Sequence, residues 1–204
     1  MNLFVLGATG AIGKHLLDIA LERGHRVTAY VRSPQKIHLD HERLKVIQGD
    51  VFDADQMEHS LVGHDAILSA FGPTTVRSST SRRKFGRALA VAMRKSGVRC
   101  AQIVSAAFLF PNIGFVGSIL KATLFRGMIP DMAAMEAAFS QSDLDWTIVR
   151  PPRLTNGPIT DSYRVINGAL PPGGFFISRA DVARFMIGEA ENPAHVQQIV
   201  GLAD

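Results

Sequence analysis

A glycine-rich turn near the start of the chain separates an apolar run from an amphipathic segment. The apolar run is Leu3-Phe4-Val5-Leu6, and the turn reads Gly7-Ala8-Thr9-Gly10-Ala11-Ile12-Gly13. Glycines at these three offsets allow a sharp turn after a strand, close approach of the backbone to a pyrophosphate, and tight packing of the following helix. The phosphates would face the positive end of that helix. The alternative, a turn that serves packing alone, accounts less well for the flanking strand and helix.

The remaining sequence alternates short apolar runs with helical patterns. Strands are expected at 3–6, 26–31, 44–48, 66–70, 101–106 and 146–149, and helices at 11–23, 55–61, 79–96 and 131–142. Continuous apolar runs are typical of parallel strands that are buried on both faces. We therefore expect an α/β fold with a doubly wound, mostly parallel sheet and helices on both faces, the Rossmann fold of NAD(P)-binding proteins.

The C-terminal part of the chain has its own signals. Ser178 is followed three residues later by Asp181, which resembles a capping box and predicts a last helix that ends near Glu191. The segment 151–174 is rich in proline and glycine, which favours ordered loops over a second domain. A chain of 204 residues with 47% hydrophobic content is long enough for one full core, so we expect a single domain over 1–204 with substrate loops at 106–130 and 151–177.

Other features limit location and partners. A single cysteine, Cys100, excludes an internal disulfide, and the glycine turn begins too early for a leader to precede it, so a cytoplasmic protein is expected. The apolar stretch 106–125 contains Pro111, Asn112 and Lys121, which argues against a membrane span. It is interpreted as core, as a lid or as a dimer surface, and a monomer or a homodimer remains possible.

The net charge of +4 is small, and cations concentrate between 77 and 99. A solvated helix face explains such a cluster. Because the sequence shows no recognised nucleic-acid module, nucleic acid is not an expected partner. An anionic cofactor or substrate accounts for the charge balance.

The residue after the second expected strand indicates which dinucleotide is bound. NAD-binding proteins of this architecture carry an acid about 20 positions after the glycine turn, which binds the ribose hydroxyls. Here Arg32 stands in that place, and no acid occurs from 28 to 39. A guanidinium pairs well with a 2′-phosphate, and Lys36 adds a second positive charge. We therefore predict NADP(H) as cofactor, with NAD(H) less favoured; a solvated arginine at a strand end is the alternative.

Further cofactor contacts are expected where the next strands end, since ligands of open α/β sheets bind beyond the carboxyl ends of the strands. After the third strand, Asp50 is placed to accept the adenine amino hydrogen and Val51 to pack on the ring, although Asp50 also suits a plain turn. After the fourth strand, small residues let a cofactor pass over the sheet. The expected contacts there are Ala70, Phe71, Gly72 and Thr74.

Taken together, the motifs resemble those of the atypical short-chain dehydrogenases/reductases that include biliverdin-IXβ reductase, also called NADPH-dependent flavin reductase, and NmrA-like proteins. The resemblance spans nearly the whole chain. Its marks are GATGAIG at Gly7, VRSP at Val31, GDVFD at Gly49, GPTTV at Gly72, SAAFLF at Ser105, LDWTIVRPPRL at Leu144 and ISRADVA at Ile177.

The resemblance implies further site residues. Its cofactor contacts would include Ser105, Ala106, Pro151, Pro152, Arg153 and Leu154. Its substrate would lie on the nicotinamide near Ala107, Phe108, Phe110 and Arg153. The family pattern has a serine at the position of Ala106 and a histidine at that of Arg153, and these departures argue against bilin specificity. Arg153 suits an anionic substrate, a cofactor phosphate or a solvated loop.

The sequence also limits the chemistry. Most short-chain dehydrogenases use a Tyr-x-x-x-Lys pair for proton exchange with substrate. In this chain Tyr30 is followed four residues later by Pro34, and Tyr163 by Asn167. Alcohol, ketone and epimerase chemistry by that pair is therefore disfavoured. Ser105 is the one polar candidate for a catalytic role.

The favoured function is an NADPH-dependent oxidoreductase that transfers hydride to a flavin-like, quinone-like or other conjugated small molecule, with the proton taken from water. One alternative is a non-catalytic NADP(H)-binding redox sensor or regulator of the NmrA-like type. Another is a pathway-specific reductase or isomerase whose substrate fits the segment 155–174. No metal site is expected, because His38 and His41 lie in a polar connection with only Asp40 and Glu42 nearby.

Overall fold

A sheet of eight strands in the order β3-β2-β1-β4-β5-β6-β10-β8 forms the centre of the molecule in the computed structural model. The structure describes residues 1–72, 80–112, 119, 122–123 and 125–204. The strands are β1 (Asn2–Leu6), β2 (Arg26–Val31), β3 (Leu44–Gln48), β4 (Ala66–Ser69), β5 (Cys100–Val104), β6 (Asp145–Arg150), β8 (Arg164–Asn167) and β10 (Gln198–Ala203). All neighbours pair in parallel except β8, which runs antiparallel to β10.

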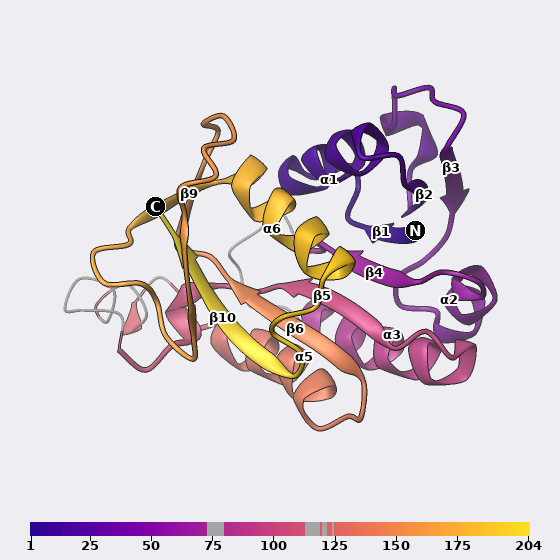
Figure 1. Cartoon of the computed structure of the whole chain (residues 1–204). Helices are drawn as coiled ribbons and strands as arrows, with labels where there is room; N and C mark the ends of the chain where they lie inside the picture. Colours follow the sequence, from indigo (N-terminus) through magenta and orange to yellow (C-terminus); the bar gives the residue numbers. More distant parts are fainter. Residues whose placement is uncertain (73–79, 113–118, 120–121, 124) are drawn as a thin grey trace.

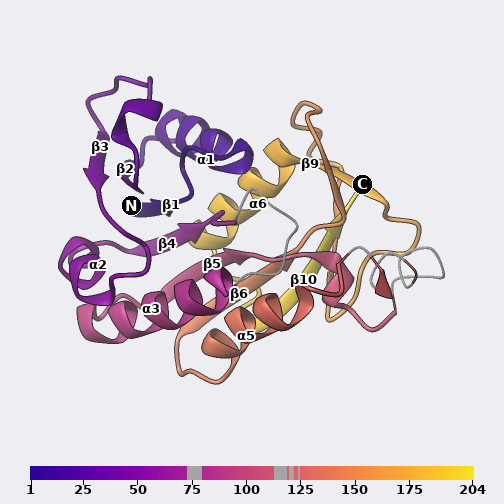
Figure 2. The same ribbon diagram turned by 180° about the vertical axis from the view of Figure 1, so that it is seen from behind.

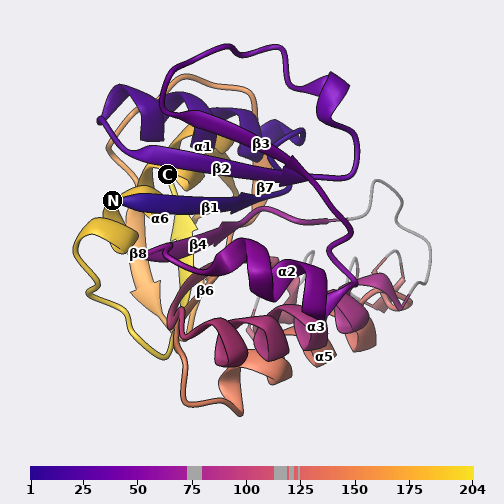
Figure 3. The same ribbon diagram turned by 90° about the vertical axis from the view of Figure 1, so that its right-hand side faces the viewer.

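Helices cover both faces of this sheet (Figure 1). Helices α1 (Ala11–Glu22) and α6 (Arg179–Glu191) pack together on one face. Helices α2 (Ala54–Leu61), α3 (Ser81–Ser96) and α5 (Ile129–Ser140) cover the other, as the views from behind and from the side also show (Figures 2 and 3). Short 3-10 turns occur at η1 (Pro34–Lys36) and η2 (Ala107–Leu109). The prediction of a doubly wound α/β fold with mostly parallel strands is confirmed.

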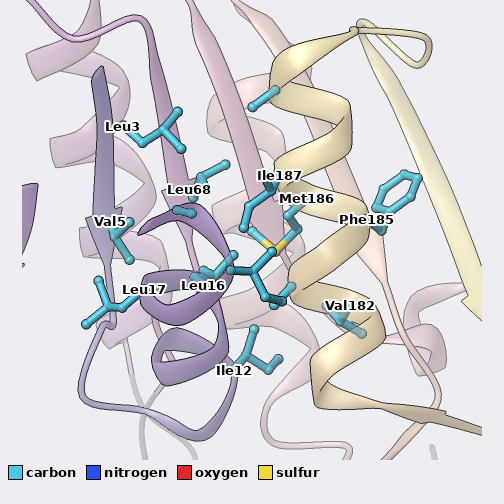
Figure 4. Packing of buried hydrophobic residues seen from close by; sticks show 14 of the residues in the cluster. Leu3, Val5, Ile12, Leu16, Leu17, Leu68, Val182, Phe185, Met186 and Ile187 are labelled. Carbon is cyan, nitrogen blue, oxygen red and sulfur yellow. The ribbon is translucent and has the colours of Figure 1, made fainter. Parts of the chain in front are cut away.

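Each face of the sheet has its own hydrophobic core, because successive side chains of a strand point to opposite faces. Leu3 and Val5 of β1 pack with α1 and α6, and Figure 4 shows them beside Leu16, Met186 and Ile187. The alternate residues of β1, Phe4 and Leu6, join α2, α3 and α5 on the opposite face. Burial on both sides explains the continuous apolar run that the sequence shows.

Polar side chains define the ends of two helices. Ser178 caps α6 by accepting a hydrogen bond from the amide of Asp181 at 2.9 Å, so the predicted start of the last helix and its serine cap are confirmed. Helix α3 begins at Ser81 without a cap from its own N-cap residue. Asp131 of α5 supplies the cap instead, because its carboxylate accepts the amides of Arg82 and Arg83, each at 3.0 Å.

The expectation of loops over 151–174 is wrong in part. This segment contains β8 and also β7 (Arg153–Thr155), which pairs with β9 (Phe176–Ser178) in a separate two-stranded sheet. The last strand, β10, was not predicted either. All four strands are short or depend on partners far along the chain, so local periodicity gives little sign of them.

Smaller differences concern strand ends and exposure. The strand expected at 66–70 ends at Ser69, and the strand expected at 101–106 ends at Val104, where the chain leaves the sheet toward η2. The expected strand at 44–48 exists, but it is the edge strand β3 and Val46 is 37% exposed. In the part of the chain that the structure describes, no helix combines the length and apolar character required to cross a membrane.

Candidate functional site

The glycine turn lies at the carboxyl end of β1, where the sheet reverses its winding direction between β1 and β4. Gly7 has φ +78°, and a side chain there would place its Cβ 2.7 Å from the backbone of Ala70. A Cβ on Gly13 would lie 2.1 Å from the carbonyl oxygen of Gly7. The turn therefore requires glycine at both positions, as the motif predicts.

Helix α1 begins within the glycine motif, directly after Gly10. Gly10 is its N-cap residue and provides no side-chain hydrogen bond to the first amides of the helix. Such amides are free to bind an anion, and the helix dipole adds positive potential at the same place. The amide of Gly10 donates to the carbonyl of Gly7 at 2.9 Å, and the other amides of the turn and of the first turn of α1 form a cradle that fits the phosphates of a dinucleotide.

A cavity of about 460 Å³ lies at the same edge of the sheet, at the carboxyl ends of β2 and β3, and β2 is the neighbour of β1. Arg32 lines it together with Gln48, Gly49, Asp50 and Gln56. Arg32 and Asp50 were expected at the cofactor site, and the structure brings them together in one cavity. Lys36 is exposed on η1 and does not line this cavity. The positive charge inside the cavity therefore comes from Arg32.

Gln56 organises the turn after β3, a role that sequence reasoning missed. Its side-chain oxygen accepts hydrogen bonds from the hydroxyl of Tyr30 at 2.8 Å and from the amide of Asp50 at 2.9 Å. The carboxylate of Asp50 accepts the amide of Phe52 at 3.0 Å, which is the turn geometry weighed as the alternative for this residue. Asp50 is nevertheless exposed, and its other oxygen remains available to a ligand. A glutamine three residues into a short helix gives no sequence signal for such a contact.

The chain after β4 passes the glycine turn closely. The amide of Ala70 donates to the carbonyl of Leu6 at 2.9 Å, which continues the pairing of β4 with β1. Phe71 packs on the buried Phe85, with 4.4 Å between ring centroids, and Gly72 is exposed. The predicted contact Thr74 lies outside the described residues.

Ser105 lies just beyond β5, beside the end of β6. Its amide donates to the carbonyl of Val149 at 2.7 Å, so the backbone is fixed in place. The side chain is 8% exposed, and its hydroxyl has no hydrogen-bond partner among the described residues. Buried hydroxyl groups are nearly always hydrogen-bonded, and an unpaired one at a strand end suits a role in ligand contact. Ala106 follows in extended conformation and is half-buried.

The residues after β6 lie at the same carboxyl edge of the sheet as Ser105. Pro151 is buried, and its carbonyl accepts the amide of Ala107 at 2.9 Å, which ties β6 to η2. Pro152 and Leu154 are half-buried. Arg153 is exposed on β7, and its guanidinium carbon lies 5.7 Å from the ring centroid of Phe176. The structure thus places a cation and an exposed aromatic ring side by side near the predicted substrate side.

The predicted substrate residues after β5 differ in accessibility. Phe108 is half-buried and stacks on Phe125, with 4.6 Å between ring centroids. Ala107 is buried, and Phe110 is only 1% exposed. The ring of Phe110 lies under the guanidinium of Arg150 at 4.7 Å, and Arg150 pairs with the buried Glu136 of α5. Phe110 is therefore a core residue behind this edge, and a substrate contact for it stays a prediction.

Both tyrosines are packed against other residues and have a raised pKa. Burial, together with the charges of Asp53 and Asp50, raises the pKa of Tyr30 to about 12. Burial also raises the pKa of Tyr163, whose ring packs edge-on against Phe185 at 6.2 Å. Neither phenol is poised for proton exchange near neutral pH. Among the described residues, no three His, Cys, Asp or Glu side chains gather closely enough to hold a metal ion.

The sheet order, the winding reversal between β1 and β4 and the glycine turn at that edge define a Rossmann protein of the dinucleotide-binding class. The chain belongs to the NAD(P)H-binding family, whose model matches residues 7–193. It is therefore a member of the NAD(P)H-binding family with a fold like that of short-chain dehydrogenases/reductases.

One curated relative and two solved structures are similar to this chain over nearly their full length. The uncharacterised protein YwnB of Bacillus subtilis is 26% identical over 209 residues, which cover 96% of this chain and 94% of that protein. A candidate NADH-flavin reductase of Streptococcus pneumoniae is 25% identical, with a TM-score of 0.82 and coverage of 100% and 99%. A short-chain dehydrogenase/reductase of Veillonella parvula in complex with NADP has the same fold, with 21% identity, a TM-score of 0.80 and coverage of 100% and 94%.

Proposed function

We propose that this protein is a reductase that uses NADPH to reduce a flavin-like, quinone-like or other conjugated small molecule. One observation carries the proposal: neither of the two tyrosines has a lysine four residues later, and burial raises the pKa of both, so neither is set up to exchange a proton with substrate. Reduction of a conjugated acceptor takes its proton from water and needs no such residue. Chemistry on alcohols or ketones by the tyrosine route does need one.

The residues of this chain then have distinct roles. NADPH, when bound, supplies the hydride. The amides of the glycine turn and of the first turn of α1 bind the pyrophosphate, and Arg32 pairs with the 2′-phosphate. The hydroxyl of Ser105 orients the acceptor, because its hydrogen-bonding capacity is unused by the described residues. The likeness to a candidate NADH-flavin reductase at 25% identity supports the same reaction class.

The test measures the loss of NADPH absorbance when the purified protein is mixed with NADPH and one acceptor: FMN, FAD, biliverdin or a small quinone. A sample without protein is the control for each acceptor. Saturable oxidation with one acceptor class is the expected result. Tight NADPH binding without oxidation by any of these acceptors would overturn the proposal. It would favour a redox sensor of the NmrA-like type or an isomerase.

Ser105→Ala tests the role of the hydroxyl within this reaction. Loss of one hydrogen bond to the acceptor should raise KM for the acceptor about tenfold and change kcat less. Ser140→Ala, at the exposed end of α5, is the matched control and should behave as wild type. If Ser105→Ala leaves both constants unchanged, Ser105 has no part in acceptor binding.

A further inference from the structure

A second cavity, of about 690 Å³, lies at the edge of the sheet opposite the glycine turn. It is formed where β1, β2 and β3 begin and where the chain enters β4, the edge marked by the N-terminus in Figure 3. The polar residues that line it include Asn2, Arg26, Thr28, Glu42, Lys45 and His64. Its volume falls in the range of roughly 300–1,000 Å³ that is typical of small-molecule sites. None of these residues belongs to the proposed cofactor site.

The strand register brings two cations to one face of the sheet. Asn2 pairs with Arg26, and Thr28 pairs with Lys45 in parallel register. Since side chains two residues apart point to the same face, Arg26 and Thr28 share a face, and Lys45 lies on it beside Thr28. This is the face on which Phe4 is buried, because Phe4 is the register partner of Thr28. The cationic side chains therefore border one cavity.

The floor of the cavity is polar and fixed by internal hydrogen bonds. Thr28 is 7% exposed, and its hydroxyl lies 2.8 Å from Nε2 of His64. Nδ1 of His64 lies 3.0 Å from the carbonyl of Leu61, which only accepts, so Nδ1 donates there. The ring of His64 also packs edge-on against Phe4 at 5.1 Å. These contacts make the floor rigid and leave the charges at the rim for a ligand.

The rim carries more positive than negative charge. Arg26 and Lys45 are exposed, and no ion pair within the described part of the chain includes either of them. Glu42 is the single acid among the described lining residues and is likewise outside every such ion pair. Arg43 also lines the cavity, but one of its guanidinium nitrogens donates to the carbonyl of Leu21 at 3.4 Å. Its charge therefore lies toward α1.

We propose that this cavity binds a small organic anion with a phosphate group, at a site separate from that of the dinucleotide. A phosphate monoester carries a charge of about −1.5 to −2 near neutral pH, so the two cations on one face attract it more strongly than Glu42 repels it. Arg26 presents a planar fork of donors, and Lys45 a compact point charge, both of which bind phosphate oxygens. The cavity is larger than a free phosphate ion, so the organic part of the ligand would fill the remaining volume.

The test is an NMR titration of the ¹⁵N-labelled protein with ribose 5-phosphate, inorganic phosphate and ribose as probes. Each titration is made without NADPH and again with NADPH in excess. Ribose 5-phosphate should shift amides at the starts of β1, β2 and β3 and at His64 in both conditions. It should bind more tightly than inorganic phosphate, and ribose should cause no shift.

Three outcomes would overturn the proposal. The first is no shift at these amides. The second is a set of shifts confined to 7–12 and Arg32, which would place the phosphate in the dinucleotide site. The third is equal affinity for ribose 5-phosphate and inorganic phosphate, which would exclude a contribution from the organic part.

Charge variants provide the matched controls. Arg26→Gln and Lys45→Gln should each weaken ribose 5-phosphate binding about tenfold, because each removes a charged hydrogen-bond donor. Glu42→Gln should tighten binding, since it removes the acid from the same rim. Arg94→Gln, at an exposed cation of α3, should leave the affinity unchanged. The amide spectra report whether each variant is folded, and an unchanged affinity in the folded double variant Arg26→Gln/Lys45→Gln would contradict the site.

Discussion

Arg32 is the residue on which the proposed preference for NADPH depends. It follows β2, is exposed, and lines the cavity at the carboxyl ends of β2 and β3. The sequence predicts its role because an acid is missing where NAD-binding proteins carry one. The structure adds that Asp50 shares this cavity while Lys36 does not line it. Recognition of a 2′-phosphate would therefore depend on one guanidinium more than on a pair of cations.

Arg32→Asp should weaken NADPH binding about 10- to 100-fold, because a charged hydrogen bond contributes roughly 1.5–3 kcal/mol. NADH binding should be unchanged or stronger, since a carboxylate suits the ribose hydroxyls. Fluorescence titration with both dinucleotides measures the ratio of affinities. Lys45→Gln, a cation at the opposite edge of the sheet, should leave that ratio unchanged. An unchanged ratio in Arg32→Asp would show that Arg32 does not contact the phosphate.

At the level of elements, the start of α6 is hydrogen-bonded to the loop at 160–161, which precedes it in the sequence. The carboxylate of Asp181 accepts the amide of Thr160 at 2.9 Å and its hydroxyl at 3.0 Å. It also accepts the amide of Asp161 at 3.2 Å and the hydroxyl of Ser178 at 2.8 Å. The sequence predicts the contact between Ser178 and Asp181, because that contact is local. The bonds to 160 and 161 depend on how the preceding loop folds over the helix.

These hydrogen bonds make stability depend on pH. Burial alone would raise the pKa of Asp181, but the hydrogen bonds from Thr160, Ser178 and Asp161 outweigh it and lower the pKa. A carboxyl with a lowered pKa in the folded state stabilises the fold fully above its unfolded pKa of about 3.9. This stabilisation decreases as pH falls below that value and is lost below the folded pKa.

Asp181→Asn should lower the free energy of unfolding by about 3 kcal/mol at neutral pH, because charged hydrogen bonds are lost and an amide group faces donors. The difference from wild type should shrink as pH falls below about 4. Urea unfolding of both proteins from neutral to acidic pH measures this difference in the free energy of unfolding. Asp18→Asn, at an exposed acid of α1, should match wild type throughout. A constant difference at all pH values would contradict the assigned role of the charge.

At the scale of the whole molecule, the two cavities described above lie at opposite edges of one sheet. Strands β2 and β3 extend from the cavity with Arg26 and Lys45 to the cavity with Arg32. The glycine turn lies at the same edge as the second of these, at the carboxyl end of β1 and against Ala70 after β4. A dinucleotide at that edge would contact segments that are far apart in the sequence. Its binding should therefore stabilise the domain as a unit.

NADPH at a hundred times its Kd should raise the free energy of unfolding by about 2.7 kcal/mol, provided that it binds the folded chain alone. For a domain of this size the melting temperature should rise by roughly 5–10 °C. Differential scanning fluorimetry with NADPH and with NADH at equal concentration measures the effect. NADH should give the smaller shift, and equal shifts would contradict the preference for NADPH. No shift with either one would exclude the dinucleotide site.

The sequence by itself determined the parts of this protein that depend on neighbouring residues. The strand, the glycine turn and helix α1 follow from apolar periodicity and from backbone positions that no side chain can occupy, as the close approaches at Gly7 and Gly13 show. The basic residue after β2 is likewise a local signal. Because β1 is buried on both faces, its residues form a continuous apolar run, and this run predicts the strand from the sequence.

The tertiary structure decided what depends on contacts between distant segments. Strands β7 to β10 gain their partners only when the chain folds back on itself, and Gln56 reaches Asp50 and Tyr30 only across the turn after β3. Burial of the Ser105 hydroxyl without a partner among the described residues, and of Phe110 beneath Arg150, arises from the packing of separate elements. Local sequence specifies which conformations a segment adopts, but contacts across the fold decide which side chains meet and which are left for a ligand.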